Sequence, residues 1–255
     1  MNDIGLVFIP GGGMAGWVWR DLDADLRRRA ILIEGRLKSN DRESRLNATL
    51  SDCVEHVTGQ MQGSGNSEFI VIGHSGGGML APLVAKRMRK EVKGIVLVCA
   101  SIPENHTNTL HGLPFPIKLL NRLAVRMQVS VDSTPARSRE RMIRSMFCNT
   151  ASEEVIDYVL GQTLLSEPLC VINEKVDWTG VPDIPMTYIR LLNDKTGSLT
   201  LQDRMAANLA IRDKVDIESD HMVMLSHPVQ FNDALRRIVE KQTSASHAKA
   251  AAVMV

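Results

Sequence analysis

Residues 69–80 read FIVIGHSGGGML and place Ser75 directly after an apolar run. The segment GHSGG fits the pattern G-x-S-x-G, which is typical of a sharp strand-to-helix turn that exposes a nucleophilic serine. Glycines suit such a turn because a Cβ atom there would collide with the neighbouring strand and helix. Apolar residues at 79–84 predict the helix that follows, although Pro82 is expected to kink it. The pattern therefore predicts that Ser75 is a nucleophile.

A serine hydroxyl is a weak nucleophile unless a histidine, itself held by a carboxylate, accepts its proton. His221, in ESDHMVMLSHP, follows an apolar run at 214–217, and Asp194, in RLLNDKTG, follows the preceding run in the same way. The chain order serine, acid, histidine goes with this type of turn. We therefore predict His221 as the base and Asp194 as its acid. Asp203 and Asp220 lie nearby and stay open as alternatives to Asp194.

The other histidines fit the role of base less well. His74 precedes the serine and is expected to point away from its side of the turn. His56 falls within a predicted helix, and His227 precedes a proline that starts the last predicted helix. His106 and His111 lie in the segment between the fourth and fifth predicted strands.

The reaction also needs two N–H groups for the negative charge that forms on the acyl oxygen. One is expected from Gly76, the residue after the nucleophile, and the other from the loop PGGGMAGWVW that follows the first apolar run. Residues 11–13 are all glycine, so this backbone can approach a substrate oxygen; we predict Gly12 and Gly13 as the candidates. No GxGxxG or GKS pattern accompanies these glycines, so a phosphate cradle is disfavoured.

The composition is that of an ordinary globular chain of 255 residues, with 44% hydrophobic residues, 23% charged residues and a formal net charge of +1. Neither nucleic acid nor an anionic membrane is therefore expected as a partner. The four cysteines, at positions 53, 99, 148 and 170, show no CxxC spacing, so we expect reduced thiols and a cytoplasmic protein without a zinc or redox site. The first residues lack a signal-peptide pattern, and no apolar run is long enough to span a membrane.

Short runs that are apolar at every position alternate with helical patterns, as in a parallel sheet covered on both faces. The six runs lie at 4–9, 30–34, 69–73, 94–100, 186–192 and 214–217. This alternation predicts an α/β fold, a mostly parallel, doubly wound sheet of about six strands. Ligands of such sheets bind beyond the carboxyl ends of the strands, where Ser75, Asp194 and His221 are all expected.

Residues 102–181 break this alternation, because helical signals occur there without strands. One such signal is the pair Thr150 and Glu153, which predicts a capping box. We expect a helical cap inserted over the sheet, with residues 1–101 and 182–241 forming the core. Residues 242–255 are small and poor in bulky side chains, so we expect a loose tail.

At these positions the sequence resembles the α/β-hydrolase superfamily, and within it the group of plant methylesterases, salicylate-binding esterases and hydroxynitrile lyases. FIPGGGMAGWVW is similar to that group's oxyanion loop, GHSGGG to its serine turn and SDHMVMLSHP to its histidine segment. The resemblance implies an α/β-hydrolase fold, a triad of Ser75, Asp194 and His221, a helical cap over a mostly apolar pocket and no cofactor.

The sequence departs from the group's pattern at a few positions. Pro10 stands where the group has a histidine, which changes the bonding of the oxyanion loop. Lyases of the group carry a threonine in that loop and a lysine after the catalytic histidine, whereas this chain has Gly11 and Met222. The resemblance is therefore to the esterases.

The main hypothesis is a serine hydrolase that cleaves a small ester, a lactone or a thioester through an acyl-enzyme. Two alternatives stay open. A cofactor-independent dioxygenase, which resembles this superfamily, or a lyase would use only the histidine and aspartate pair, and a receptor would bind a small ligand without turnover. We expect a small-molecule substrate and no metal; the oligomeric state, a homodimer included, is open.

Overall fold

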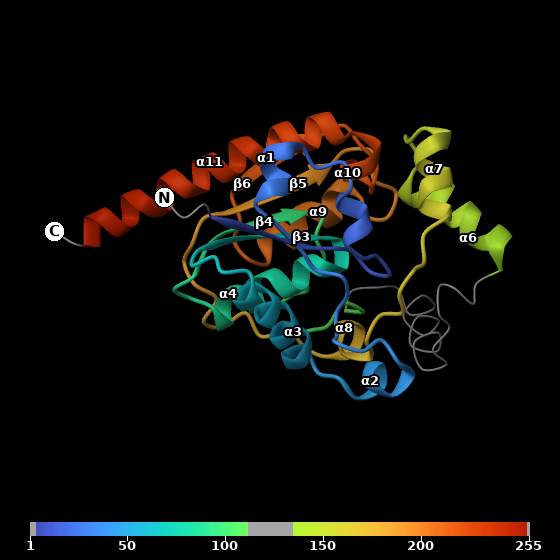
Figure 1. The fold of residues 1–255 in the computed structure, drawn as a ribbon. Helices are drawn as coiled ribbons and strands as arrows, with labels where there is room; N and C mark the ends of the chain where they lie inside the picture. The colour runs from blue at the N-terminus through green and yellow to red at the C-terminus, as the bar shows by residue number, and fades with distance from the viewer. Residues whose placement is uncertain (1–3, 112–134, 254–255) are drawn as a thin grey trace.

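The computed structural model describes residues 4–111 and 135–253 of the chain. Its centre is one sheet with the strand order β2-β1-β3-β4-β5-β6, in which every neighbouring pair is parallel (Figure 1). The strands are β1 (Gly5–Ile9), β2 (Ala30–Leu32), β3 (Phe69–His74), β4 (Val92–Val98), β5 (Met186–Leu191) and β6 (Asp213–Ile217). All six apolar runs predicted as strands are confirmed.

Helices cover both faces of the sheet, as its continuous apolar strands require. The helices at the core are α1 (Ala24–Arg28), α2 (Arg42–Asn47), α3 (Leu50–Gly63), α4 (Leu80–Arg87), α9 (Leu199–Ala207), α10 (Val223–Ser226) and α11 (Pro228–Val253). Two short 3-10 helices complete this part of the fold: η1 (Gly16–Trp19) comes after the glycine loop that follows β1, and η2 (Ser75–Met79) follows β3 directly.

Successive residues of β1 enter different cores, because side chains of a strand alternate between faces. Phe8 packs in the cluster that holds α1 and α11, whereas Val7 packs in the cluster that holds α3 and α4. Figure 1 shows α11 and α1 on one side of the sheet and α3 and α4 on the other. The doubly wound α/β architecture is therefore confirmed.

The start of α4 shows why a proline is tolerated at position 82, where we expected a kink. The helix starts at Leu80, after the 3-10 turn η2, so Pro82 lies in its first turn. Backbone N–H groups of a first turn have no partner within the helix, so a proline is tolerated there. Pro82 thus removes no hydrogen bond from the helix.

Residues between β4 and β5 form helices and no strand within the described part of this segment, 102–111 and 135–181. The helices are α6 (Ala136–Met142), a π-helical turn η4 (Ile143–Phe147), α7 (Glu153–Leu160) and α8 (Leu169–Asn173). Figure 1 shows α6 and α7 together beside the sheet. Residues 112–134 of the expected cap lie outside the described residues.

The predicted capping box at Thr150 is wrong. Ser152 is the N-cap of α7, and its hydroxyl accepts a hydrogen bond from the N–H of Val155. The backbone N–H and hydroxyl of Thr150 instead donate to Asp220, each at 2.9 Å. This contact is 70 residues distant in sequence, so local pattern could not reveal it.

Helix α11 continues to Val253, where we expected a loose tail from residue 242. Gln242 explains the difference, because its side chain is buried against the sheet. Its amide donates to the carbonyl of Ile95 at 3.0 Å and to the hydroxyl of Thr187 at 3.1 Å, which ties α11 to β4 and β5. None of the helices within residues 4–111 and 135–253 has the length and apolar character needed to cross a membrane.

Candidate active site

Ser75 lies at the junction of β3 and η2, at the carboxyl end of the sheet. Its φ of +50° is a left-handed conformation, which costs energy in any residue with a side chain. The carbonyl oxygen of Ser75 accepts a hydrogen bond of 2.9 Å from the N–H of Ser101, which follows β4. A strained serine is thus held at the sheet edge by the neighbouring strand.

Two glycines of the G-x-S-x-G pattern are required by crowding, as the sequence predicted. A Cβ on Gly73 would lie 2.6 Å from the Cα of Gly78, and one on Gly77 would overlap the carbonyl oxygen of Pro10. Gly76 differs, because a Cβ there would meet nothing closer than the N of Gly12 at 3.5 Å, an ordinary van der Waals contact. Glycine at position 76 is therefore not a steric necessity.

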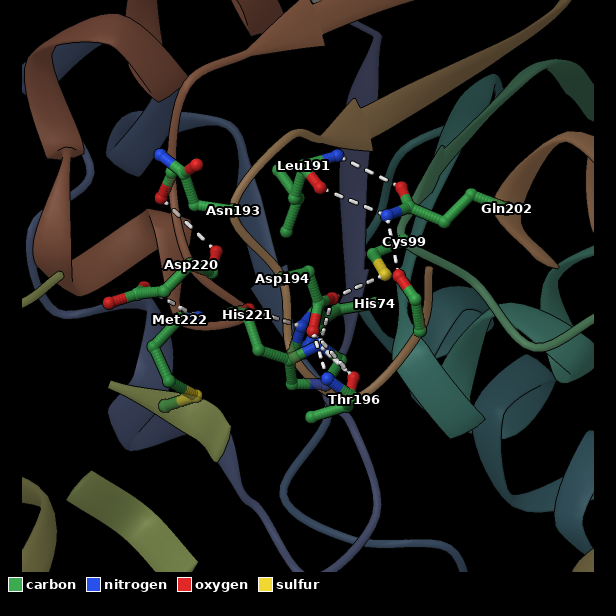
Figure 2. A network of polar contacts seen from close by, with 12 residues as sticks. His74, Cys99, Leu191, Asn193, Asp194, Thr196, Gln202, Asp220, His221 and Met222 are labelled. Atoms are coloured by element: carbon green, nitrogen blue, oxygen red, sulfur yellow. Dashed lines mark hydrogen bonds and ion pairs between the residues drawn. The ribbon is translucent and has the colours of Figure 1, made fainter. Parts of the chain in front are cut away.

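The structure brings His221 and Asp194 together, although 27 residues separate them. Nδ1 of His221 lies 2.6 Å from Oδ2 of Asp194, and both side chains are almost fully buried. Each residue follows the end of a strand, β5 for Asp194 and β6 for His221. Figure 2 shows the two side chains pointing toward one another from these loops.

Asp194 receives hydrogen bonds at both carboxylate oxygens. Besides His221, the thiol of Cys99 donates to Oδ2 at 2.7 Å, and the N–H and hydroxyl of Thr196 donate to Oδ1 at 2.6 and 2.8 Å (Figure 2). Burial alone would raise the pKa of Asp194, but the contact with His221 and the donors Cys99 and Thr196 hold it below its usual value.

This carboxylate determines the tautomer of His221. An ionised Asp194 can only accept hydrogen bonds, so the proton of the neutral imidazole must lie on Nδ1. Nε2 then carries the lone pair that a general base requires. The hydroxyl of Thr196, 2.9 Å from Nδ1, adds a second polar contact on the same side of the ring.

His74 packs against the ring of His221 and hydrogen-bonds to its backbone. Its ring centroid lies 4.7 Å from that of His221, and its Nε2 donates to the backbone carbonyl of His221 at 3.0 Å. Burial, followed by the proximity of His221, holds the pKa of His74 well below its usual value, so this ring is neutral. Since Ser75 is the next residue in the chain, the contact brings the serine turn to the histidine loop.

The two alternative acids have other partners. Asp203 pairs with Arg190 at 3.0 Å and with Lys214 at 2.6 Å on the surface. Asp220 is buried and accepts hydrogen bonds from Thr150, from the N–H of Met222 and from the hydroxyl of Ser226. Of the three aspartates considered from the sequence, Asp194 is the one hydrogen-bonded to the imidazole of His221.

The glycine loop after β1 lies beside the serine turn. Gly12 is exposed, and its N lies 3.5 Å from the place a Cβ on Gly76 would take. The N–H of Gly13 already donates to Oε1 of Glu167 at 2.9 Å, and the carbonyl of Gly13 accepts from the N–H of Leu165 at 2.8 Å. Of the two candidates in the loop, Gly12 has its backbone N next to the serine turn, whereas the N–H of Gly13 is taken by Glu167.

The segment between β4 and β5 contacts both sides of this arrangement. Phe147 lies edge-on to the ring of His221 at 5.3 Å, and its carbonyl accepts from the N–H of Met222. On the other side, the hydroxyl of Tyr158 donates to the carbonyl of Trp17, next to the glycine loop. The segment therefore bridges the histidine loop and the glycine loop.

Several residues at the site had no signal in the sequence. From the sequence, Cys99 is expected only to be a reduced thiol, and Thr196 lies two residues after Asp194 without a pattern of its own.

The buried side chain of Gln202 holds the loop that carries Asp194, through both the N–H and the carbonyl of Leu191 at 2.9 Å (Figure 2). Arg36 and Glu167 form an ion pair across 131 residues. Such contacts depend on the fold.

One group of side chains in the described residues has the composition of a metal site. Ligand atoms of Cys99, Asp194 and His221 all lie within 4.8 Å of one another. Burial, followed by the charge of Asp194, raises the pKa of the Cys99 thiol well above its usual value. Metals bind the thiolate, so the protonated thiol acts here as a hydrogen-bond donor to Asp194.

The sequence matches the profile of the alpha/beta hydrolase family over residues 6–234, which includes every residue of the arrangement described above. Among curated proteins, it is 30% identical over 112 residues to a carbendazim hydrolyzing esterase from Nocardioides. That match covers 42% of this chain and 46% of the esterase, so it spans less than half of the relative's length.

Solved structures resemble the fold over nearly the whole chain. An extracellular alpha/beta-hydrolase from a Paenibacillus species, which shares homology with tobacco salicylic acid binding protein 2, has a TM-score of 0.75 at 19% identity. The similarity covers 92% of this chain and 99% of that one. A methylesterase from Arabidopsis has a TM-score of 0.70 at 16% identity and covers 93% and 99% of the two chains. At these identities the likeness concerns the fold.

Proposed function

Because this chain belongs to the alpha/beta hydrolase family, we propose that it is a serine hydrolase that cleaves a small carboxylic ester, a lactone or a thioester. The observation that carries the proposal is the buried contact of 2.6 Å between His221 and Asp194. It leaves Nε2 of His221 as a base, and the hydrogen bond between His74 and the carbonyl of His221 joins the same loop to the residue before Ser75. The name of the Nocardioides relative, a hydrolyzing esterase, supports the same class of reaction.

The reaction proceeds in two halves through an acyl-enzyme. Oγ of Ser75 attacks the acyl carbon while Nε2 of His221 takes the hydroxyl proton, and Asp194 stabilises the imidazolium that forms. His221 then gives the proton to the leaving oxygen, or sulfur in a thioester. In the second half, His221 takes a proton from water, the hydroxide attacks the acyl carbon, and Ser75 is released with its proton restored.

The N–H groups of Gly76 and Gly12 stabilise the negative oxygen of the tetrahedral intermediate. This assignment follows from the close approach of the two residues and from the occupied N–H of Gly13. Glu167, which accepts that N–H, holds the loop in place. Preorganised donors of this kind typically lower the barrier by about 3 kcal/mol each.

Residues 102–181 act as a cap that restricts access to the acyl site. The contacts of Phe147 with His221 and of Tyr158 with Trp17 attach the described part of this segment to two loops around the site, as a cap over the substrate requires. We also assign the protein to the reducing cytoplasm, because all four cysteines are buried free thiols.

Replacing the nucleophile tests the proposal directly. Ser75→Ala is expected to lower kcat by about 10⁶-fold on a p-nitrophenyl ester, the loss typical of a removed triad serine. A fluorophosphonate should label the wild-type chain at Ser75 and leave the variant unlabelled. Ser51→Ala, at an exposed position on α3, is the matched control and should retain wild-type activity.

The same variant distinguishes the other functions considered from the sequence. Turnover that survives Ser75→Ala and consumes oxygen would replace the hydrolase with a dioxygenase. Saturable binding of an ester by the wild-type chain, without multiple turnovers, would indicate a receptor. A loss of less than tenfold on Ser75→Ala would refute the assigned nucleophile.

A further inference from the structure

Arg36, in the loop after β2, is a buried arginine with an incomplete set of partners. Its side chain is 4% exposed, and its Nε donates to Oε2 of Glu167 at 3.2 Å. Nη1 and Nη2 are also buried, and neither has a hydrogen-bond partner among the residues that the structure describes. Buried guanidinium nitrogens normally all find acceptors, so two open ones leave a place for an acceptor from outside the chain, either a water molecule or a ligand.

The open nitrogens lie beside the acyl site. Nη2 of Arg36 is 3.9 Å from the place a Cβ on Gly76 would take, and the N of Gly12 is 3.5 Å from the same point. Crowding does not require glycine at position 76, in contrast to Gly73 and Gly77. The missing side chain therefore leaves room next to Ser75 that faces a charged donor and a backbone donor.

The nearby carboxylates are engaged elsewhere. Glu167 accepts from Gly13 as well as from Arg36, and Glu34 accepts from the N–H of Gly16 at 3.1 Å. Arg36 also borders a cavity of about 290 Å³, and Lys38 adds a second cation to its wall. The edge of the guanidinium that carries Nη1 and Nη2 therefore receives no acceptor from either carboxylate.

We propose that this edge of Arg36 binds a carboxylate of the substrate, so that the preferred ester carries a free carboxylate group. A guanidinium edge matches the two oxygens of a carboxylate in a bidentate pair, which a lysine cannot form. The inference rests on the proposed function, since it specifies the substrate of the same acyl site. It also restricts the size of the substrate: because Nη2 lies close to the residue after Ser75, only a few carbons separate the carboxylate from the scissile carbonyl. Monoesters of short dicarboxylic acids meet this requirement.

Two esters that differ only in charge provide the test. Monomethyl succinate and methyl butyrate have the same alcohol and the same acyl length, and only the first carries a carboxylate. The wild-type chain is expected to have the higher kcat/KM on monomethyl succinate. Arg36→Met should raise KM for monomethyl succinate about tenfold to a hundredfold, the range for a lost charged hydrogen-bond pair, and change methyl butyrate less than threefold.

Control variants separate recognition from other roles of Arg36. Arg36→Lys keeps the charge without the planar edge and should recover only part of the preference. Arg87→Met, at an exposed position on α4, should leave both esters unchanged. Equal losses on the two esters in Arg36→Met would overturn the proposal, because they would assign Arg36 to the oxyanion or to loop structure. A wild-type chain without preference for monomethyl succinate would overturn it without any variant.

Binding of succinate, measured by calorimetry, distinguishes this inference from the function on which it rests. The wild-type chain and Ser75→Ala should both bind succinate, and Arg36→Met should not. If the wild-type chain binds succinate through Arg36 but cleaves neither ester, the hydrolase proposal fails and the carboxylate site stands. If it cleaves methyl butyrate but does not bind succinate, the carboxylate site fails and the hydrolase stands.

Discussion

Two buried polar regions lie next to the residues that flank Ser75, one at His74 and the other at Gly76, and they differ in how completely they are paired. On the histidine side, both oxygens of Asp194 receive donors, from His221, Cys99 and Thr196. On the glycine-loop side, Arg36 uses Nε but leaves Nη1 and Nη2 without partners among the described residues.

In the first region the chain itself supplies the hydrogen-bond partners of Asp194. In the second, the partners that we propose for Nη1 and Nη2 come from a ligand. Every donor on Asp194 fixes the direction of the imidazole, so that region is preorganised for proton transfer. Buried donors without an acceptor destabilise the free protein. A ligand that supplies the acceptor therefore binds more tightly, and more selectively, than one that does not. The paired side therefore suits catalysis, and the unpaired side suits recognition.

The largest effect is expected on breaking the paired region. Asp194→Asn replaces an acceptor with an amide that can donate, which favours the wrong tautomer of His221, and should lower kcat by about 10⁴-fold. The measurement is steady-state kinetics on a p-nitrophenyl ester. Asp203→Asn, at the surface pair with Arg190, is the control and should cost less than threefold. A larger loss in the control than in Asp194→Asn would reassign the acid.

Removing the one partner of Arg36 tests the other region. Glu167→Ala leaves the buried guanidinium without its ion pair and frees the N–H of Gly13, so unfolding free energy should fall by about 3 kcal/mol. Urea denaturation at pH 7 provides the value. Glu167→Gln retains an acceptor for the same N–H and should lose less. Equal stability of the alanine variant and the wild type would show that the pair contributes nothing.

The smallest effect concerns His74, which contacts the paired region through His221. Its lowered folded pKa means that below pH 6.5, the ordinary value, the unfolded chain binds a proton that the folded chain rejects. The free energy of unfolding should therefore decrease as the pH is lowered below 6.5, by up to about 1.4 kcal/mol per pH unit. Above pH 6.5 His74 should have no effect on it. In His74→Gln this dependence is removed, so urea transitions at pH 7.5 and 5.5 should differ less than in the wild type. Parallel changes in the two proteins would contradict a neutral His74.

The sheet could be predicted from the sequence because buried parallel strands are apolar at every position. The run at 69–73 became β3, and the alternation with helices determined the architecture. The boundary of the tail could not be found this way: Gln242 is polar in the sequence, and only the contact with Ile95 shows that it is buried.

The candidate site was predictable where residues follow strand ends. Ser75, Asp194 and His221 each occupy such a position, and the place of Asp194 directly after a predicted strand favoured it over Asp203 and Asp220. Arg36 and Glu167 were missed because their pairing joins loops 131 residues apart, and neither belongs to a motif. Choosing Gly12 over Gly13 likewise depended on a hydrogen bond made by a distant side chain.

The segment between β4 and β5 is attached to both sides of the site through main-chain atoms. The carbonyl of Phe147 accepts from the N–H of Met222, and the N–H of Leu165 donates to the carbonyl of Gly13. Such bonds form with any side chain except a proline at the two donor positions. Side chains of this segment can therefore change during evolution while its backbone attachment to the site is kept. Substrate preference could then change without displacing Ser75, Asp194 or His221.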